Sequence, residues 1–429
     1  MRFFSSAPVS TGADSFLAAG RFGRFREFIP NSGRCRADTL PNMQPGEALL
    51  AWFDRHKRAL PWRREDSPPG ASSFPVVDPY GVWISEIMLQ QTRVETARPY
   101  YLRFLARFPD VASLAEADEA EVLALWSGLG YYRRCRALLA AARTIVAEGG
   151  ALPRTARELE LLPGIGPYTA AAIASIAFAE VVPVLDGNVE RVVCRYAARS
   201  AGAKRRSDRS ALLAIAAGFL DPARPGDSNQ ALMELGATVC TPRSPRCTVC
   251  PLAEGCQARA LAAAESFPAS EPRPAAERVR QLVAFVEVRG RVLLFRRSPS
   301  AGQLAGLWDF PAVDLGGPAA PEAQLAAAFG GFWTLGAEVT RLRHAITTRS
   351  FAIEVRRAVY APAGEGAGVE SDTLAEGAGA EPGVVGGSAR ASDGAATADL
   401  HWWGREAAGG LPLTGVARKV LARAASQPT

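Results

Sequence analysis

The chain has 429 residues, of which 48% are hydrophobic and 21% are charged, and its formal net charge is +6. This length argues against a single domain, and the apolar runs are too short for a membrane-spanning helix, which needs about 20 residues. Seven cysteines without a clear secretory signal argue against a disulfide scaffold, and three histidines argue against chemistry that needs several of them.

The positive charge is unevenly distributed. Residues 362–399 carry seven acids and one arginine, which leaves a net +12 on the rest of the chain. Such an excess suits a polyanionic partner. The acidic segment is rich in Gly, Ala and Ser, so we predict a low-complexity, disordered insertion there.

The first part of the chain is predicted to be helical. Residues 1–43 show no periodicity, and we interpret them as a disordered or mis-started segment rather than a targeting peptide. From 44 to 260, apolar residues recur at i, i+3, i+4 and i+7, which predicts a mainly α domain.

Glu86 lies within "VWISEIML", on the same predicted helical face as Val82, Trp83 and Leu89. Burial on that face would raise the pKa of its carboxyl group and keep a proton available for general acid catalysis. Most glutamates within helices are solvated, so the residue pattern alone does not decide this role.

The stretch "LPGIGPYTA" (162–170) predicts a sharp turn before a helix. Gly164 and Gly166 can adopt positive φ and expose their N–H groups, and Pro167 suits the first helical position. With a helix predicted over "TARELELL", the result is a helix, a hairpin turn and a helix that can hold a phosphate. An ordinary interhelical turn explains the turn alone equally well.

Asp186 stands before another predicted helix, "GNVERV". It can cap that helix, and it can also place a negative charge beside a cation that develops on a sugar. The two roles are compatible.

Four cysteines fall within 17 residues with the spacing C-x6-C-x2-C-x5-C, namely Cys240, Cys247, Cys250 and Cys256. Four thiolates so close can hold a zinc ion or an iron–sulfur cluster. Structural zinc sites usually show two C-x2-C pairs, and this chain has one, but spacing alone does not choose between zinc and an iron–sulfur cluster.

Residues 261–279 are rich in Ala, Pro and Glu and are interpreted as a linker. Beyond them the pattern changes to short alternating runs. The stretch "QLVAFVEVRGRVLLFRRS" predicts a hairpin, "FAIEVRRAVYA" and "DLHWWG" predict strands, and "PEAQLAAAFGG" predicts a helix. Residues 280–429 are therefore predicted to form an α/β domain.

Together these motifs resemble the helix-hairpin-helix DNA glycosylases of the endonuclease III superfamily, and most closely the adenine DNA glycosylases of the MutY family. The resemblance covers roughly residues 45–260 and depends on "YGVWISEIMLQQTRVET", "LWSGLGYYRRCRAL", "LPGIGPYTA", "LDGNVERV" and "NQALMELGATVC". It implies a [4Fe–4S] cluster on the four cysteines. Through "GLWDFP" (306–311) it extends more loosely to a Nudix-like C-terminal domain.

The resemblance also implies residue roles. Glu86 would protonate an adenine flipped out of the duplex, Asp186 would stabilise the sugar cation, and Tyr168 and Asn188 would orient these groups. Gly164 and Gly166 would bind DNA phosphate. Residues implied to contact the adenine or the base stack are Trp62, Arg63, Gln230, Gln91, Thr92, Leu129 and Tyr131, although Trp62 and Tyr131 also suit a core and Gln91 a solvated helix.

Tyr168 occupies the position at which endonuclease III-type relatives have a lysine that forms a Schiff base. A tyrosine cannot form one, so the resemblance implies base removal without strand cleavage.

The Nudix-like domain is implied to recognise 8-oxoguanine opposite the adenine. The family usually has Phe-Ser-His in the contacting loop, whereas this chain has Ile346-Thr347-Thr348. Thr347 can still donate a hydrogen bond in place of the serine, but the histidine is lost. The Glu-rich box of Nudix hydrolases is absent from the sequence, which argues against hydrolase activity.

We therefore predict a monofunctional glycosylase that excises adenine mispaired with 8-oxoguanine or guanine in base excision repair. It would bind double-stranded DNA as a monomer, in a bacterial cytoplasm and associated with the nucleoid. One alternative is an endonuclease III-type enzyme for oxidised pyrimidines, against which Tyr168 and the appended domain argue. Another is a non-catalytic iron–sulfur DNA-binding protein, against which the presence of both Glu86 and Asp186 argues.

Overall fold

A computed structural model describes residues 44–63, 77–200, 202, 205–269, 275–298, 301, 304–346, 348–363 and 399–424. The N-terminal segment, Thr347, part of the linker and nearly all of the acidic insertion lie outside these residues. Within the described ranges, no helix has both the length and the apolar character needed to cross a membrane. The predicted fold class, a mainly helical domain followed by an α/β domain, is confirmed.

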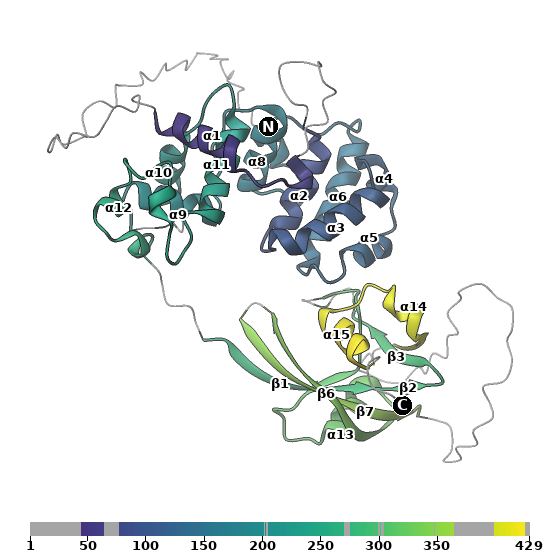
Figure 1. Ribbon diagram of the computed structural model, residues 1–429. Coiled ribbons are helices and arrows are strands. Elements are labelled where there is room, and N and C mark those ends of the chain that lie inside the picture. Colours follow the sequence, from purple (N-terminus) through teal and green to yellow (C-terminus); the bar gives the residue numbers. More distant parts are fainter. Residues whose placement is uncertain are drawn as a thin grey trace, which may run out of the picture. The chain divides into compact units, whose positions relative to one another are not determined.

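The first part is built from helices (Figure 1). These are α1 Pro45–His56, η1 Pro61–Arg63, α2 Pro79–Leu89, α3 Val94–Arg107, α4 Val111–Glu116, α5 Glu119–Trp126, α6 Tyr132–Ala147, α7 Ala156–Leu159, α8 Pro167–Phe178, α9 Gly187–Tyr196, α10 Arg206–Ala217, α11 Pro225–Thr238, η2 Cys247–Val249, α12 Gln257–Ala260 and η3 Ala264–Ser266.

Helix α8 is the central helix of this part because it contributes to two hydrophobic cores. Ala170 and Ile173 pack into the core with α2, α3, α5 and α6, whereas Ala171 and Ala172 pack into the core with α1, α9 and α11. Small side chains let neighbouring helices approach α8 from both sides. A helix that is apolar on all sides is typical of such a buried position.

Helix α11 packs closely against both α8 and α9, and two glycines make this possible. A Cβ added at Gly226 would lie 2.5 Å from the carbonyl oxygen of Ser175, and one at Gly236 would lie 2.7 Å from the Cβ of Asn188. Only glycine fits at such distances. These contacts fix the position of α11, whose side chains enter the candidate site.

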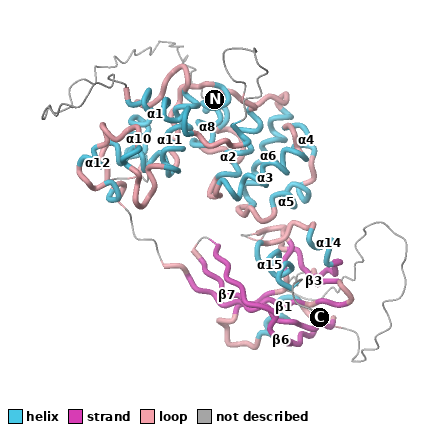
Figure 2. Tube along the Cα trace, viewed as in Figure 1, coloured by secondary structure: helices cyan, strands magenta, loops and turns pink. Residues whose placement is uncertain are grey.

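The second part contains two sheets and three helices within the described residues (Figure 2). The elements are β1 Glu277–Phe285, β2 Glu287–Val288, β3 Arg291–Arg296, β4 Trp308–Asp309, β5 Ala312–Asp314, α13 Pro321–Phe329, β6 Phe332–Ile346, β7 Arg349–Ala361, β8 Leu400–Gly404, α14 Arg405–Gly409 and α15 Gly415–Ala424.

One sheet has the strand order β5-β1-β7-β6, in which β1 and β7 are parallel and β6 and β7 form a long antiparallel hairpin. The other contains β2-β3-β4, with β8 paired to β3. Residues of α15 pack on one face of the first sheet, and residues of α13 pack on the other.

The predicted hairpin is present as β2 and β3, and its turn residues Arg289 and Gly290 have φ of 49° and 72°. Both values suit a tight two-residue turn. The predicted helix 321–331 and the strands in 351–361 and 399–404 are also found, as α13, β7 and β8. Strand β6 was not predicted, and β1 begins inside the segment interpreted as linker.

Candidate active site

Glu86 lies on α2, a helix that is buried along most of its length. Asp78 caps the helix by accepting hydrogen bonds from the N–H groups of Tyr80 and Gly81, and Pro79 occupies its first position. Glu86 itself is only 7% exposed. Removal from water raises the pKa of its carboxyl group to about 7, although Tyr168 and Arg63 act in the opposite direction. The group can therefore hold or release a proton near neutrality.

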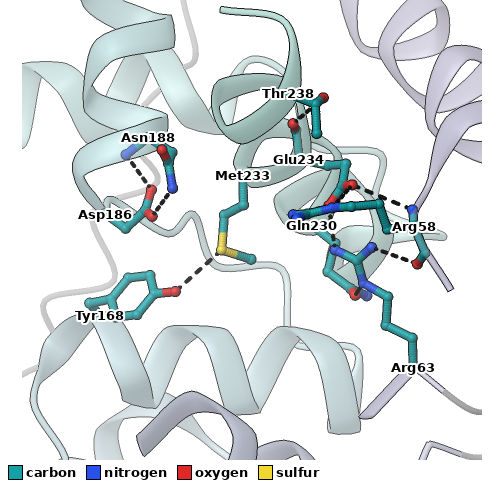
Figure 3. Close-up of polar contacts among 9 residues, drawn as sticks. All are labelled: Arg58, Arg63, Tyr168, Asp186, Asn188, Gln230, Met233, Glu234 and Thr238. Atoms are coloured by element: carbon teal, nitrogen blue, oxygen red, sulfur yellow. Dashed lines mark hydrogen bonds and ion pairs between the residues drawn. The ribbon is translucent and has the colours of Figure 1, made fainter. Parts of the chain in front are cut away.

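Asp186 caps α9, as one of its two predicted roles requires. One carboxylate oxygen accepts the N–H groups of Asn188 at 3.0 Å and Val189 at 2.7 Å, and the other accepts the Asn188 side-chain amide at 3.0 Å (Figure 3). Burial raises the pKa of Asp186, and these hydrogen bonds oppose the rise. Asp186 also raises the pKa of Glu86 by charge repulsion, so the two carboxyl groups share one electrostatic environment.

Tyr168 lies in the first turn of α8 and is hydrogen-bonded to Glu86. Its hydroxyl group donates a hydrogen bond to Glu86 Oε2 at 3.0 Å and lies 3.2 Å from the sulfur of Met233. Burial and the nearby carboxyl groups raise the pKa of the phenol well above its usual range. Tyr168 therefore acts as a neutral donor that orients Glu86.

A second group of polar side chains, from α11 and from the segment around η1, lies on the other side of Met233 from Tyr168 and Asp186 in Figure 3. Arg63 donates from Nε to Gln230 Oε1 at 2.8 Å and from Nη2 to Glu234 Oε2 at 3.0 Å. Arg58 donates to the same carboxylate at 2.5 and 3.1 Å. The structure thus brings together the predicted Arg63 and Gln230.

Glu234 and Arg58 were not singled out from the sequence. Glu234 is 1% exposed and carries a charge between two arginines, an arrangement that keeps the carboxylate ionised and lowers its pKa. The i, i+4 spacing of Gln230 and Glu234 within "NQALMELGA" places both on one helical face, and this spacing was the available signal.

Trp62 is 9% exposed and packs edge-to-face against Tyr101, with ring centroids 5.3 Å apart. Leu129 is 6% exposed and belongs to the hydrophobic core. The structure therefore does not bring Leu129 to the surface, where contact with a base stack would require it.

Gln91 and Tyr131 are exposed, unlike the buried Leu129, and both lie in loops with positive φ, of 56° and 53°. Tyr131 is 46% exposed. Arg134, which the sequence analysis did not identify, connects these loops. It donates to the carbonyls of Ile87, Met88 and Gln90 and to the Thr92 hydroxyl, and it lies over the Tyr131 ring at 5.2 Å.

The glycine turn has the predicted form, with one difference. Gly164 has a φ of 78°, and a Cβ there would lie 2.5 Å from the Cβ of Ala137. Gly166 instead has extended backbone with φ −94° and is the N-cap of α8, with Pro167 following. A capping residue needs extended geometry, and this explains the difference. The preceding helix, α7, is capped by Thr155 and Glu158.

The four predicted cysteine ligands line one cavity, together with Arg195, Arg246, Arg259 and apolar side chains. Across the described residues, no group of three or more His, Cys, Asp or Glu is placed to hold a single metal ion. Four thiols that line a common cavity can hold an iron–sulfur cluster or a zinc ion. The geometry therefore fits the iron–sulfur interpretation, and the choice between the two groups comes from the comparisons below.

Two arginines of α9, the buried Arg195 and the half-buried Arg191, hold this loop. Arg195 donates to Cys240 Sγ at 3.4 Å and to the carbonyl groups of Thr241 and Pro242. Arg191 donates to the Cys240 carbonyl at 2.7 Å and to Asn188 Oδ1 at 2.9 Å. A continuous set of hydrogen bonds thus connects Asp186 to the cysteine loop.

Comparison with known proteins agrees with this geometry. Residues 84–214 match the HhH-GPD superfamily of base excision DNA repair proteins, and residues 240–256 match the iron–sulfur binding domain of endonuclease III. The loop of four cysteines is thus an iron–sulfur site, and its cofactor is a [4Fe–4S] cluster.

Several curated relatives of the chain are adenine DNA glycosylases. The chain is 42% identical over 311 residues to the adenine DNA glycosylase of Mus musculus, covering 62% of this chain and 60% of the relative. It is 41% identical over 250 residues to that of Mycolicibacterium smegmatis, covering 57% and 78%. A solved thermostable thymine-DNA glycosylase is 25% identical, with a TM-score of 0.43 and coverage of 49% and 93%.

The chain spans less than two-thirds of the length of the mouse relative but more than three-quarters of the mycobacterial one. With the helix-hairpin-helix fold and the iron–sulfur loop, this similarity shows that the chain belongs to the adenine DNA glycosylase family.

Proposed function

We propose that the protein is a monofunctional DNA glycosylase that removes adenine mispaired with 8-oxoguanine or guanine. The observation that carries this proposal is the pairing of Glu86, whose pKa is about 7, with Tyr168 at 3.0 Å. The first group supplies a proton near neutrality. The second occupies the position from which a lysine would attack the sugar in a lyase.

In the proposed reaction, adenine leaves the duplex and enters the space near Glu86, Arg63 and Gln230. Glu86 donates its proton to N7 of the base, which makes the base a better leaving group. Asp186 stabilises the positive charge that develops on the sugar, because its carboxylate is held by three N–H donors. Water then attacks the sugar and completes hydrolysis of the N-glycosidic bond.

The other predicted residues have supporting roles in this proposal. The amides of the hairpin at Gly164 and Gly166 hold a phosphate, and the loops of Gln91 and Tyr131 contact the base stack. The iron–sulfur loop presents Arg243 and Arg246, both exposed, to the DNA backbone. The C-terminal domain reads 8-oxoguanine through a loop that contains Thr347 and Thr348. We place this activity in a bacterial cytoplasm, at the nucleoid, with the protein acting as a monomer.

The test is single-turnover cleavage of a labelled duplex with one adenine opposite 8-oxoguanine, with and without hot alkali. We expect strand breaks only after alkali, because base removal leaves an abasic site that alkali cleaves. Breaks without alkali would show lyase chemistry and contradict the proposal. A duplex with an oxidised pyrimidine tests the endonuclease III-type alternative, and Glu86→Gln is the control that should bind the mispair without releasing adenine.

A further inference from the structure

A basic surface lies on one face of the β5-β1-β7-β6 sheet, at the end nearest the tip of the β6–β7 hairpin. The strand register defines it. Arg280 of β1 and Arg343 of β6 are both paired with Ala352 of the strand between them. Arg278 is paired with Ser350 in the next row. Because side chains alternate along a strand, these residues point to the same face.

This face is the one that α13 covers further along the sheet. Leu282 and Ala284 of β1 and Ala358 and Tyr360 of β7 have the same parity and pack in the core with α13. The hydrophobic cover ends before the arginine rows, where Arg278, Arg280 and Arg343 are exposed. We call these three arginines, with Arg341, Ser350 and Ala352, the arginine ledge.

Within the described part of the chain, the ledge carries positive charge that acidic side chains do not neutralise. Arg341 pairs with Glu338 at 2.9 Å, and Glu354 lies 3.8 Å from Arg356. The side chains of Arg278, Arg280 and Arg343 have no ion pair or hydrogen bond with any described residue. Guanidinium groups bind phosphate through paired N–H donors, so three free ones on one face form an anion-binding surface.

The shape of the ledge suits an extended ligand. The strand spacing places the Cα atoms of Arg280 and Arg343 roughly 10 Å apart, with only Ala352 between them. Along β1, Arg278 and Arg280 are about 7 Å apart. The small side chains of Ser350 and Ala352 leave a shallow floor between two basic rims. A chain of phosphates can lie along this floor with arginines on both sides.

We propose that the arginine ledge binds the sugar–phosphate backbone of duplex DNA, beside the base that the hairpin tip contacts. This inference rests on the proposed function, which makes duplex DNA the partner. The ledge is continuous with the tip, because the N–H of Glu277, next to Arg278, donates to the carbonyl of Thr348 at 2.8 Å. Backbone contacts of this kind position a protein without reading sequence.

The test is the salt dependence of binding to an undamaged labelled duplex, measured by fluorescence anisotropy. Each phosphate contact contributes about 0.9 to the slope of log affinity against log salt. Replacing Arg278, Arg280 and Arg343 with glutamine should therefore reduce the slope by up to about 2.7. Between 50 and 200 mM salt, wild-type affinity should fall about 40-fold more than the affinity of this variant.

Two matched variants complete the test. The same three positions changed to lysine keep the charge and should keep most of the slope. Arg291, Arg357 and Arg423 are exposed elsewhere in the domain, and their replacement with glutamine makes an equal change in net charge. An unchanged slope in the ledge variant, or an equal reduction in this second triple variant, would overturn the proposal.

Undamaged DNA is used so that the result does not depend on adenine excision. One outcome is that the wild-type protein releases no adenine while the ledge variant still shows a reduced slope of log affinity against log salt. That result would contradict the proposed function and would support DNA binding by the arginine ledge. Melting temperatures of all variants check that each remains folded.

Discussion

Two carboxyl groups in one site have different surroundings, and this difference supports the roles that we propose for them. Glu86 is buried, with the Tyr168 hydroxyl group as its hydrogen-bond donor, so its protonated form is favoured. Asp186 accepts three N–H groups at the start of α9, where hydrogen bonds and the helix dipole favour a charge. A proton donor and a fixed anion are what cleavage of a glycosidic bond requires.

The raised pKa of Glu86 makes the stability of the protein depend on pH. The pKa is about 7 in the folded chain against 4.5 for an ordinary glutamate. Between these values the unfolded chain releases the proton and the folded chain retains it, so stability falls as pH rises through this window. The loss amounts to about 3 kcal/mol, and Glu86→Gln should not show it.

Denaturant unfolding of both proteins at several pH values from 4.5 to 8 measures this difference. We expect Glu86→Gln to gain stability relative to wild type as the pH rises, while adenine release by the wild type slows above pH 7. A stability difference that stays constant across this range would show that Glu86 titrates normally.

Glu234→Gln should lower the stability of the protein and shift the pH dependence of adenine release, without removing a group that contacts the base. The variant leaves Arg58 and Arg63 without their shared carboxylate, and loss of one partner from a buried ion pair costs about 3–5 kcal/mol. Arg63 already lowers the pKa of Glu86, and without Glu234 its charge is less compensated. The pH at which adenine release declines should therefore move lower.

Unfolding and the pH profile of single-turnover adenine release together test this role. A purely structural role for Glu234 would lower stability and leave the pH profile in place. Glu254→Gln removes an exposed acid of the cysteine loop and is the matched control.

At the scale of secondary structure, α8 and the hairpin before it hold most of the site. Gly166 is exposed at the N-cap of α8, and the first turn of the helix places the Tyr168 hydroxyl group against Glu86. The two glycines of the turn have different constraints. Gly164 has positive φ and touches α6, whereas a Cβ on Gly166 would have no atom within 4 Å.

The same substitution at these two glycines should therefore have opposite effects. Gly164→Ser forces a side chain into positive φ and into contact with Ala137, and it should lower the free energy of unfolding by about 1–3 kcal/mol. Gly166→Ser places a good capping residue at the N-cap of α8 and should leave stability unchanged or slightly higher. Thermal unfolding of the two variants decides the matter, and equal losses would refute this account of the turn.

An element can be predicted from the sequence when the residues that determine it are close together along the chain. Helical periodicity and capping residues are local, so α2 and α8 could be predicted, whereas the residue pattern alone did not decide that Glu86 is buried. Strand β6 could not, because two register shifts near Glu338 interrupt its alternation. Glu234 and Arg58 are separated by 176 residues, so only the folded chain reveals their contact. That all four cysteines line one cavity likewise became visible only in the folded chain.

At the scale of the whole molecule, charge separates into two populations. Basic groups occupy the candidate site, the cysteine loop and the arginine ledge, whereas residues 362–399 alone carry a net −6. At low ionic strength the interaction range of exposed charges is about 30 Å, so we expect this acidic segment to oppose the approach of DNA.

Replacing the seven acids of residues 362–399 with glutamine should therefore speed association with duplex DNA. The change keeps the chain length and removes seven negative charges. Electrostatic steering changes association rates by factors of 10 or more, so we expect roughly a tenfold gain at 10 mM salt. Screening shortens the interaction range from about 30 Å to about 8 Å at 150 mM salt, where most of the gain should disappear.

Stopped-flow association at both salt concentrations measures the effect. A variant with seven serines or alanines of the same segment changed to glutamine controls for composition. A rate that is unchanged at 10 mM salt would mean that the acidic segment lies too far from the DNA-binding surfaces to act on them, and a gain that persists at 150 mM would mean that it competes for those surfaces directly.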